Sequence, residues 1–242
     1  MKDQLIDTYG RVHRDLRISV TDRCNFRCQY CMPEEGMDWT PREELLTFEE
    51  IERLASLLVN KFGIESIRLT GGEPTVRANL SKLIEKLAKL DVDLSLTTNG
   101  ATLPLIAGDL YNAGLDRINI SLDTLNRKRF ESLTRRDNLK QVLHGIETAK
   151  SVGFDPVKIN MVVMKGVNDD EVLDFVSYGR ENGLVVRFIE FMPLDADETW
   201  EKSKVMPQNE ILNLISSKHD LEPLSRGSSP AARWKFVDGP GE

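Results

Sequence analysis

Three cysteines lie within eight residues of one another near the start of the chain, and its 242 residues contain no others. Cys24, Cys28 and Cys31 follow the spacing C-x3-C-x2-C. Three thiols cannot all pair with one another, so an odd and tightly grouped set indicates a metal or cluster site rather than a disulfide framework. Thiolates at this spacing can hold three corners of an iron–sulfur cube. One iron of a [4Fe–4S] cluster would then stay open to a ligand from outside the protein.

A second polar segment, Gly71-Gly72-Glu73-Pro74, directly follows an apolar stretch. Glycine permits close backbone approach and unusual φ values, as a ligand-binding loop requires. Taken alone, such a tetrapeptide could equally be a turn that ends a strand. The elements on either side of it therefore decide how it is interpreted.

Short β-branched stretches alternate with helical patterns from about residue 16 to about residue 190. Six strands are predicted, at Leu16–Val20, Ser66–Thr70, Asp93–Thr97, Arg117–Leu122, Val157–Met164 and Val185–Glu190. This alternation is typical of βα units around a parallel sheet, and so of the α/β class. An open doubly wound sheet and a partial barrel are both compatible with it, and we predict a partial (βα)6 TIM-like barrel.

Polar residues follow the carboxyl ends of these strands, where ligands of such folds bind. The cysteines follow the first strand and the glycine-rich segment follows the second. Further polar groups end the third, fourth and sixth strands, at residues 97–100, 121–123 and 190–193. The sequence therefore predicts a single rim that carries the chemistry.

Helices are predicted between the strands. Thr47 and Glu50 form a capping-box pattern that starts the first helix. Its predicted core face consists of Ile51, Leu54, Leu57 and Leu58. Other helices are predicted over residues 80–87, after Asn168 as a candidate cap, and over residues 208–218, with one more strand at residues 232–237.

The formal net charge of −7 argues against broad nucleic-acid binding, whose footprint is a basic face. The first residues lack a basic segment followed by an apolar one, and no stretch approaches the roughly 18 apolar residues of a membrane span. We therefore expect a cytoplasmic protein with neither a nucleic-acid nor a membrane partner. Reduced thiols and an oxygen-labile cluster fit that reducing compartment.

The cysteine spacing, with an aromatic residue directly before Cys31, resembles the cluster motif of radical S-adenosylmethionine enzymes. The resemblance implies a [4Fe–4S] cluster whose open iron chelates S-adenosylmethionine, from which an electron releases a 5′-deoxyadenosyl radical. It also implies that backbone and carboxylate oxygens of Gly71-Gly72-Glu73-Pro74 receive the methionine amino group. The positions that match residues binding S-adenosylmethionine are Tyr30, Gly72, Ser121 and Met192.

Longer strings, at residues 8–11, 16–25, 68–74 and 187–192, resemble the GTP 3′,8-cyclases of molybdenum cofactor (molybdopterin) biosynthesis. That family's lyase reaction moves the radical to ribose C3′ of GTP and closes a bond to guanine C8, giving (8S)-3′,8-cyclo-7,8-dihydroguanosine 5′-triphosphate. The implied GTP contacts are Arg17, Arg68, Thr97 and Lys158, with Arg187 as a further basic candidate. Cationic side chains at strand ends suit a triphosphate, since Arg presents planar donors and Lys a compact charge.

The chain departs from that family's pattern in one respect. The family continues into a segment with a second cysteine triad, whose [4Fe–4S] cluster binds guanine, and no cysteine follows Cys31 here. We therefore expect residues 1–194 to be the barrel and residues 195–242 the start of a truncated C-terminal region that does not ligate the second cluster. The expected partners are GTP, an electron donor protein, a cyclic pyranopterin synthase acting downstream and a second copy in a homodimer.

Two other interpretations remain open at this stage. The first is another radical enzyme of the superfamily, acting on a peptide or as a dehydrogenase. The second is a catalytically silent iron–sulfur binding module. A zinc site fits less well, because structural zinc takes four ligands and the three histidines are not in register with the cysteines.

Overall fold

The computed structural model describes residues 3–33, 35–193, 200–226 and 231–242, and the chain packs into two compact units. The first unit comprises Met1–Phe26, Gly36–Ile120 and Lys140–Val157. The second comprises Arg27–Glu35, Ser121–Leu139 and Lys158–Glu242. The boundary predicted at residue 194 lies outside the described residues and stays a prediction.

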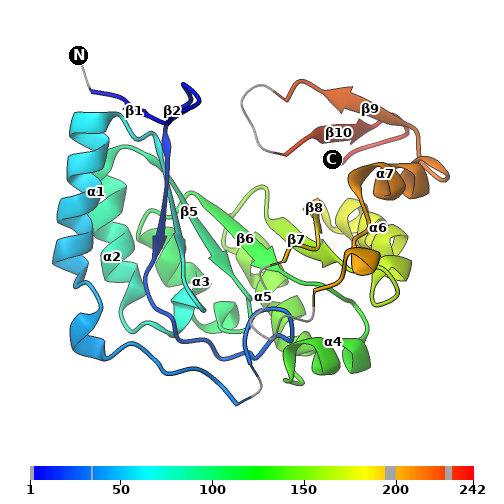
Figure 1. Ribbon diagram of the computed structural model, residues 1–242, viewed down its shortest axis with the longest axis horizontal. Helices are drawn as coiled ribbons and strands as arrows, with labels where there is room; N and C mark the ends of the chain where they lie inside the picture. The colour runs from blue at the N-terminus through cyan, green and yellow to red at the C-terminus, as the bar shows by residue number, and fades with distance from the viewer. Residues whose placement is uncertain (1–2, 34, 194–199, 227–230) are drawn as a thin grey trace. The chain divides into compact units, whose positions relative to one another are not determined.

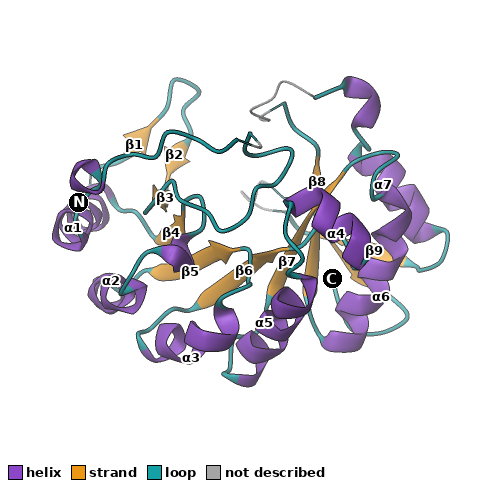
Figure 2. Cartoon of the chain, turned by 90° about the horizontal axis from the view of Figure 1, so that it is seen from below, coloured by secondary structure: helices purple, strands orange, loops and turns teal. Residues whose placement is uncertain are grey.

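The first unit is built on parallel strands backed by helices. The strands are β3 (Asp15–Ser19), β4 (Ser66–Thr70), β5 (Asp93–Thr98) and β6 (Arg117–Ser121), with a short antiparallel hairpin of β1 (Leu5–Ile6) and β2 (Val12–His13) before them. The helices are α1 (Phe48–Phe62), α2 (Leu80–Leu87), α3 (Leu103–Asn112) and α5 (Leu139–Ser151). Helices α1, α2 and α3 lie on one side of these strands (Figure 1, Figure 2).

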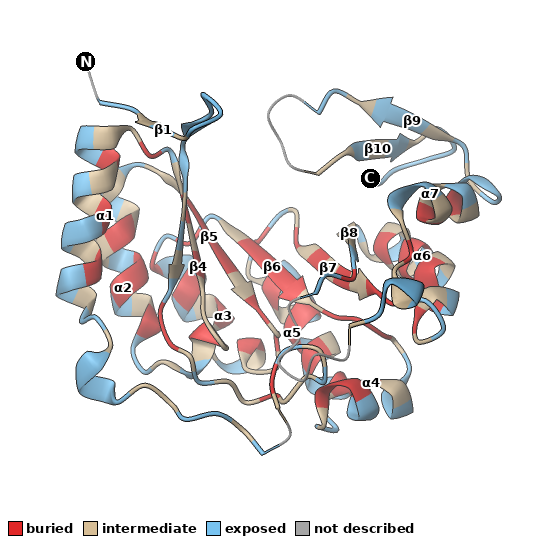
Figure 3. Ribbon diagram, viewed as in Figure 1, coloured by how far each residue is buried: buried red, intermediate tan, exposed pale blue. Residues whose placement is uncertain are grey.

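Alternation along each strand separates a core face from a polar face. In β4, Ile67 and Leu69 are fully buried, whereas Arg68 between them is half-buried. Successive side chains of a strand point to opposite faces, so the apolar ones meet the helices and the polar ones line the other side. The buried parts of the helices accordingly turn toward the strands (Figure 3).

The second unit holds two further parallel strands, β7 (Lys158–Val163) and β8 (Val185–Glu190), and an antiparallel pair, β9 (Leu221–Leu224) and β10 (Arg233–Phe236). Its helices are α4 (Arg127–Thr134), α6 (Val172–Asn182) and α7 (Gln208–Ser216). Leu133, Met164 and Phe191 form a buried apolar cluster in this unit. None of the helices in the described ranges is long and apolar enough to cross a membrane.

The long parallel strands follow the order β3-β4-β5-β6-β7-β8, which is their order along the chain. In a doubly wound sheet the order in which strands are added reverses at a switch point, so neighbours in the sheet are not always neighbours in the chain. A strictly sequential order is that of a barrel built from successive βα units. The predicted α/β class with a partial (βα)6 barrel is therefore confirmed. All six strands lie where the sequence predicts them, to within one residue at each end.

The core face predicted for α1 is partly wrong. The capping box forms, with Thr47 and Glu50 satisfying each other's backbone N–H groups. The buried stripe, however, is Ile51, Ala55 and Val59, while Leu54 and Leu57 are 42% and 50% exposed. Hydrophobicity alone selects the larger side chains, but the stripe that packs is set by where the neighbouring elements lie.

Asn168 is not the cap of α6. It precedes a 3-10 turn at Asp169–Glu171, and its side chain makes no cap bond. The carboxamide instead donates to the carbonyl oxygens of Asp123 and Val162, both at 2.8 Å, and accepts from the Met164 amide at 2.7 Å. A fully buried carboxamide satisfies its donors and acceptor wherever the tertiary structure offers partners, which overrides its capping propensity here.

Candidate functional site

The first part of the cysteine loop follows β3 in the first unit. The Cys24 Sγ accepts a hydrogen bond from the Phe26 amide at 3.3 Å. The Asn25 side-chain oxygen accepts one from Asn99 Nδ2 at 2.7 Å. Because Asn99 follows β5, the loop that carries the first thiol is fastened to a second polar loop of the predicted rim.

The second part of the loop forms a tight turn in the second unit. The amides of Cys31 and Met32 both donate to the Cys28 carbonyl oxygen at 2.9 Å. None of the three cysteines is in a disulfide; Cys24 and Cys28 are half-buried and Cys31 is exposed. The thiols therefore remain available as thiolate ligands.

Among the described residues, no three His, Cys, Asp or Glu side chains stand close enough together to hold a metal ion. The donor chemistry of the loop nevertheless fits an iron–sulfur cluster, since three thiols sit on eight residues without disulfide bonding. An amide that donates to sulfur, as Phe26 does to Cys24, is also the kind of contact that tunes a cluster.

The glycines of the second polar segment allow it to pack directly on the residues before Cys24. A Cβ at Gly71 would lie 2.4 Å from the Thr21 carbonyl oxygen, and one at Gly72 would lie 2.2 Å from that of Asp22. Any side chain there would push the two segments apart. Gly72, predicted to bind S-adenosylmethionine, is thus required by the packing of the cysteine loop as well.

Glu73 is 1% exposed, and both of its carboxylate oxygens accept from the protein. Oε1 accepts from the amide and hydroxyl of Thr75 and from the Thr98 hydroxyl at 2.6–3.0 Å, and Oε2 from the Asn99 amide at 2.6 Å. Burial raises the pKa of this carboxyl, although these donors oppose the shift. The carboxylate therefore holds the loops after β4 and β5 together, and its predicted contact with the methionine amino group stays a prediction.

Three of the predicted substrate residues share one face of the sheet in the first unit. Arg17 of β3 lies in register with Arg68 of β4, and Arg68 lies in register with Ser95 of β5. Thr97 is two residues beyond Ser95, so it points to the same face. The structure therefore places two guanidinium groups and a hydroxyl on the polar side of neighbouring strands.

The remaining cationic candidates share a face of the second unit. Lys158 begins β7, where alternate residues are buried, and Asn160 on the same face lies in register with Arg187 of β8. The Asn160 Oδ1 atom is buried and has no hydrogen-bond partner among the residues that the structure describes. Lys158 and Arg187 thus flank a polar position with an unused acceptor, which is unusual for a buried polar atom in a folded protein.

Ser121 and Met192 occupy the strand ends predicted for them. Ser121 is the last residue of β6 and is half-buried. Met192 comes two residues after β8 and is 50% exposed, so it is not a core methionine. Their predicted contacts with S-adenosylmethionine stay predictions.

Sequence reasoning assigned no role to Asp123, although this residue anchors Tyr30. The buried Asp123 carboxylate accepts from the Tyr30 hydroxyl and, at 2.8 Å, from the Val162 amide. The Tyr30 ring packs against the apolar cluster of Leu133, Met164 and Phe191. The position of this carboxylate at the end of a predicted strand indicates a functional or structural role, but the sequence alone does not show that Tyr30 is its partner.

Asp123 should make the free energy of unfolding depend on pH. Burial raises its pKa from 3.8 to about 6, while its hydrogen bonds to Tyr30 and Val162 lower it. A carboxyl with a raised pKa contributes stability below its unfolded pKa that is lost as the pH rises through its folded pKa. Two pKa units correspond to about 3 kcal/mol. Urea unfolding of the wild type and of Asp123→Asn, which keeps both contacts, would measure this.

The comparison should be made at about pH 3 and about pH 8, which bracket the two pKa values. Relative to Asp123→Asn, the wild type should lose stability between the two conditions. An equal pH dependence in both proteins would show that Asp123 does not titrate in this way.

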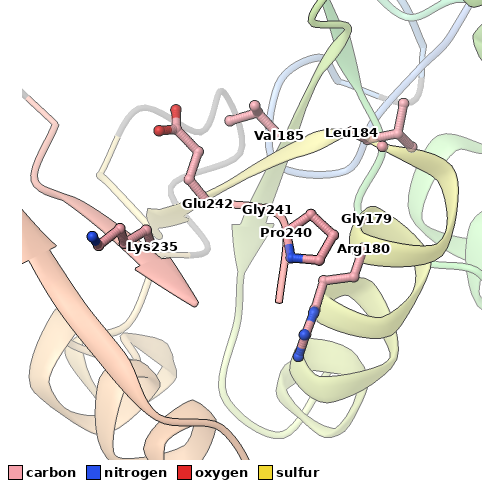
Figure 4. Close-up of a pocket in the computed structure, with 9 residues that line it drawn as sticks. Gly179, Arg180, Leu184, Val185, Lys235, Pro240, Gly241 and Glu242 are labelled. Carbon is pink, nitrogen blue, oxygen red and sulfur yellow. The ribbon is translucent and has the colours of Figure 1, made fainter. Parts of the chain in front are cut away.

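A cavity of about 370 Å³ lies elsewhere in the second unit, and its lining includes Arg180, Val185, Lys235 and Glu242 (Figure 4). Both cations have acidic partners outside it, because Arg180 pairs with Asp238 at 3.0 Å and Lys235 with Glu222 at 2.9 Å. The lining contains none of the residues predicted for the cluster, the cofactor or GTP.

Comparison with known proteins gives the same picture as the motifs. A model of the Radical SAM superfamily matches residues 18–179. The chain is 48% identical over 241 residues to a GTP 3′,8-cyclase of Streptomyces coelicolor, covering 98% of this chain and 71% of that protein. It is 49% identical over 242 residues to a mitochondrial GTP 3′,8-cyclase of Arabidopsis thaliana, covering 99% of this chain and 62% of that protein.

Among solved structures, Streptococcus suis SuiB matches with a TM-score of 0.64 at 18% identity, over 84% of this chain and 46% of that one. At this identity the likeness concerns the fold alone. The chain is thus similar to SuiB in fold and to the cyclases in amino-acid sequence.

Proposed function

The chain belongs to the Radical SAM superfamily and, within it, to the GTP 3′,8-cyclases, and we propose that it converts GTP into (8S)-3′,8-cyclo-7,8-dihydroguanosine 5′-triphosphate. This is a lyase reaction of molybdenum cofactor biosynthesis. The chain spans between 62% and 71% of the length of the two cyclases compared above, so the activity of the whole protein is part of the proposal.

Cys24, Cys28 and Cys31 would hold a [4Fe–4S] cluster, with Tyr30, Gly72, Ser121 and Met192 around S-adenosylmethionine. When bound, the cluster and S-adenosylmethionine supply a carbon radical strong enough to remove a hydrogen atom from an unactivated ribose carbon. The chain's own contribution is to orient the reacting groups and to exclude water. No protein nucleophile is required.

The observation that carries the GTP assignment is the in-register pair of Arg17 and Arg68 on adjacent strands. Like charges placed side by side repel each other, so an anion between or above them would relieve the repulsion. A triphosphate supplies several oxygen acceptors for two planar guanidinium groups. Thr97, Lys158 and Arg187 would add a hydroxyl and two further cations.

Replacing both Arg17 and Arg68 with alanine should weaken GTP binding by at least about a hundredfold, because each charge-assisted contact contributes roughly 1.5–3 kcal/mol. Cleavage of S-adenosylmethionine by the reduced cluster should persist, since neither arginine belongs to its predicted pocket. Equilibrium binding of GTP and release of 5′-deoxyadenosine after dithionite reduction measure the two effects.

Arg14→Ala is the matched control, because Arg14 is an exposed cation beside β3 that pairs with Glu65. It should leave GTP affinity unchanged. Unchanged GTP affinity in the double variant would show that the substrate assignment is wrong, while loss of 5′-deoxyadenosine release would place the arginines at the cofactor instead.

The remaining partners follow from the same proposal. A reducing protein would donate the electron, and a cyclic pyranopterin synthase would consume the product, both in the cytoplasm. A second [4Fe–4S] cluster and a homodimer would belong to the full-length enzyme. The single cysteine triad of this chain is assigned to the first cluster.

A further inference from the structure

The turn that contains Cys28 and Cys31 is docked on the carboxyl end of α4. The Gln29 side chain donates to the Ser132 carbonyl oxygen at 3.0 Å. The Gln29 backbone N–H donates to the Leu133 carbonyl oxygen at 2.9 Å. The Arg27 amide donates to the Thr134 carbonyl oxygen at 3.0 Å. The last carbonyls of a helix lack partners within the helix, so the cysteine turn acts as the cap of α4.

Arg135, directly after α4, has a backbone conformation that arginine rarely adopts. Its φ of 54° and ψ of 30° lie in the left-handed region. Among the described residues other than glycine, only Asn79, Asp91 and Arg135 have positive φ. Asn and Asp tolerate this region more readily than arginine, so contacts of Arg135 with its surroundings must offset the cost.

The Arg135 side chain shows what holds it. Its Nη1 atom donates to the Arg27 carbonyl oxygen at 3.2 Å and to the Met32 carbonyl oxygen at 3.1 Å. These two carbonyls lie at the two ends of the segment that contains Cys28 and Cys31. The Arg135 guanidinium therefore links the two ends of the cysteine turn through hydrogen bonds. Glycine would occupy this backbone position with less strain.

The charge of Arg135 has the sign that the site requires. A cation is favourable at the carboxyl end of a helix, where the helix dipole is negative. The thiolates that ligate a cluster are anionic as well. Replacement of Arg135 by glycine would relieve the backbone strain but remove both hydrogen bonds to the cysteine turn and the positive charge.

We propose that Arg135 is a positioning residue that preorganises Cys28 and Cys31 for cluster binding. The proposal rests on the proposed function only in naming the cluster as the ligand. Arg135 acts in this role through the backbone carbonyls of Arg27 and Met32. Its contribution should therefore be measurable in the iron-free chain.

The test is amide hydrogen exchange of the iron-free, 242-residue chain, followed by mass spectrometry of peptides that cover residues 27–32. In Arg135→Gly, exchange of this segment should be about tenfold faster or more, as expected when a charged hydrogen bond is lost locally. Peptides from α1 and β4 should be unchanged. Arg135→Lys, which keeps a cation, should retain part of the protection.

Asp91→Gly is the matched control, because it relieves a positive φ of similar size far from the cysteines in sequence. It should leave exchange of residues 27–32 unchanged. Unchanged exchange in Arg135→Gly would overturn the proposal. Faster exchange over the whole chain would also overturn it, because Arg135 would then support the fold in general.

Iron bound per chain after anaerobic reconstitution gives the second readout. Arg135→Gly should bind less iron than the wild type and Asp91→Gly an equal amount. Equal iron in Arg135→Gly would overturn the positioning role even if exchange were faster. If the wild type itself took up no iron, the proposed function would fail, and hydrogen exchange would still decide whether Arg135 orders the turn.

Discussion

Replacing any one of Cys24, Cys28 and Cys31 with serine should leave a folded chain that no longer assembles an iron–sulfur cluster. A serine hydroxyl is a poor substitute for a thiolate, and two cysteines cannot hold a cluster that already lacks its fourth protein ligand. Since even outer-shell changes cost metal sites 10–100-fold, loss of a ligand should lower cleavage of S-adenosylmethionine by more than about a hundredfold. Iron content and 5′-deoxyadenosine release are the measurements.

The fold should survive these substitutions, because none of the thiols is deeply buried. In Cys24→Ser, the hydroxyl oxygen can still accept from the Phe26 amide. Met37→Ser is a suitable control, since it removes a sulfur atom from a 48% exposed position just beyond the loop. A serine variant with the iron content and cleavage rate of the wild type would refute the ligand assignment, and thermal unfolding separates that result from misfolding.

The strands were predictable because their signal is local. Short apolar stretches bounded by turn residues mark β4 and β6, and the apolar residues Ile67, Leu69, Ile118 and Ile120 of these strands are fully buried. Sequential strand order was not fixed by that pattern, since a doubly wound sheet has the same alternation. The resemblance to barrel enzymes and the observed pairing decide between them.

The residues that position the cysteine loop were not predictable in the same way. Asp123 and Arg135 act on backbone and side chains about a hundred positions away in the sequence, so no local pattern reports them. Asn168 was expected to cap a helix and instead satisfies buried groups around Asp123. The type of a polar residue indicates only that it needs hydrogen-bond partners. In each of these cases a tertiary contact decides which partners it has.

The glycine-rich segment shows how one motif serves two needs. The sequence suggested a ligand cradle, and the contacts with Thr21 and Asp22 show that its glycines also let the segment lie against the cysteine loop. A substitution at Gly72 would therefore disturb loop packing whether or not a cofactor is bound. Loss of activity in such a variant would not by itself identify a cofactor contact.

Glu73 allows a sharper test, because both oxygens of its carboxylate accept hydrogen bonds from the protein itself. Glu73→Ala should lower the free energy of unfolding by about 3–5 kcal/mol, since several buried donors lose their acceptor at once. Glu73→Gln should cost less, about 1–3 kcal/mol, because one oxygen is kept while the amide group faces the Asn99 N–H. Urea unfolding of the iron-free chain at neutral pH measures both.

The size and order of these losses identify the role of Glu73. Glu85, an exposed residue on α2, provides the control, and Glu85→Ala should change stability by no more than about 0.5 kcal/mol. If Glu73→Ala were as stable as Glu85→Ala, the buried carboxylate would not hold the loops after β4 and β5 together. Contact with a ligand would then be the remaining role for this carboxylate. A large loss without any ligand present assigns Glu73 to the architecture that keeps Asn99, and through it Asn25 beside Cys24, in place.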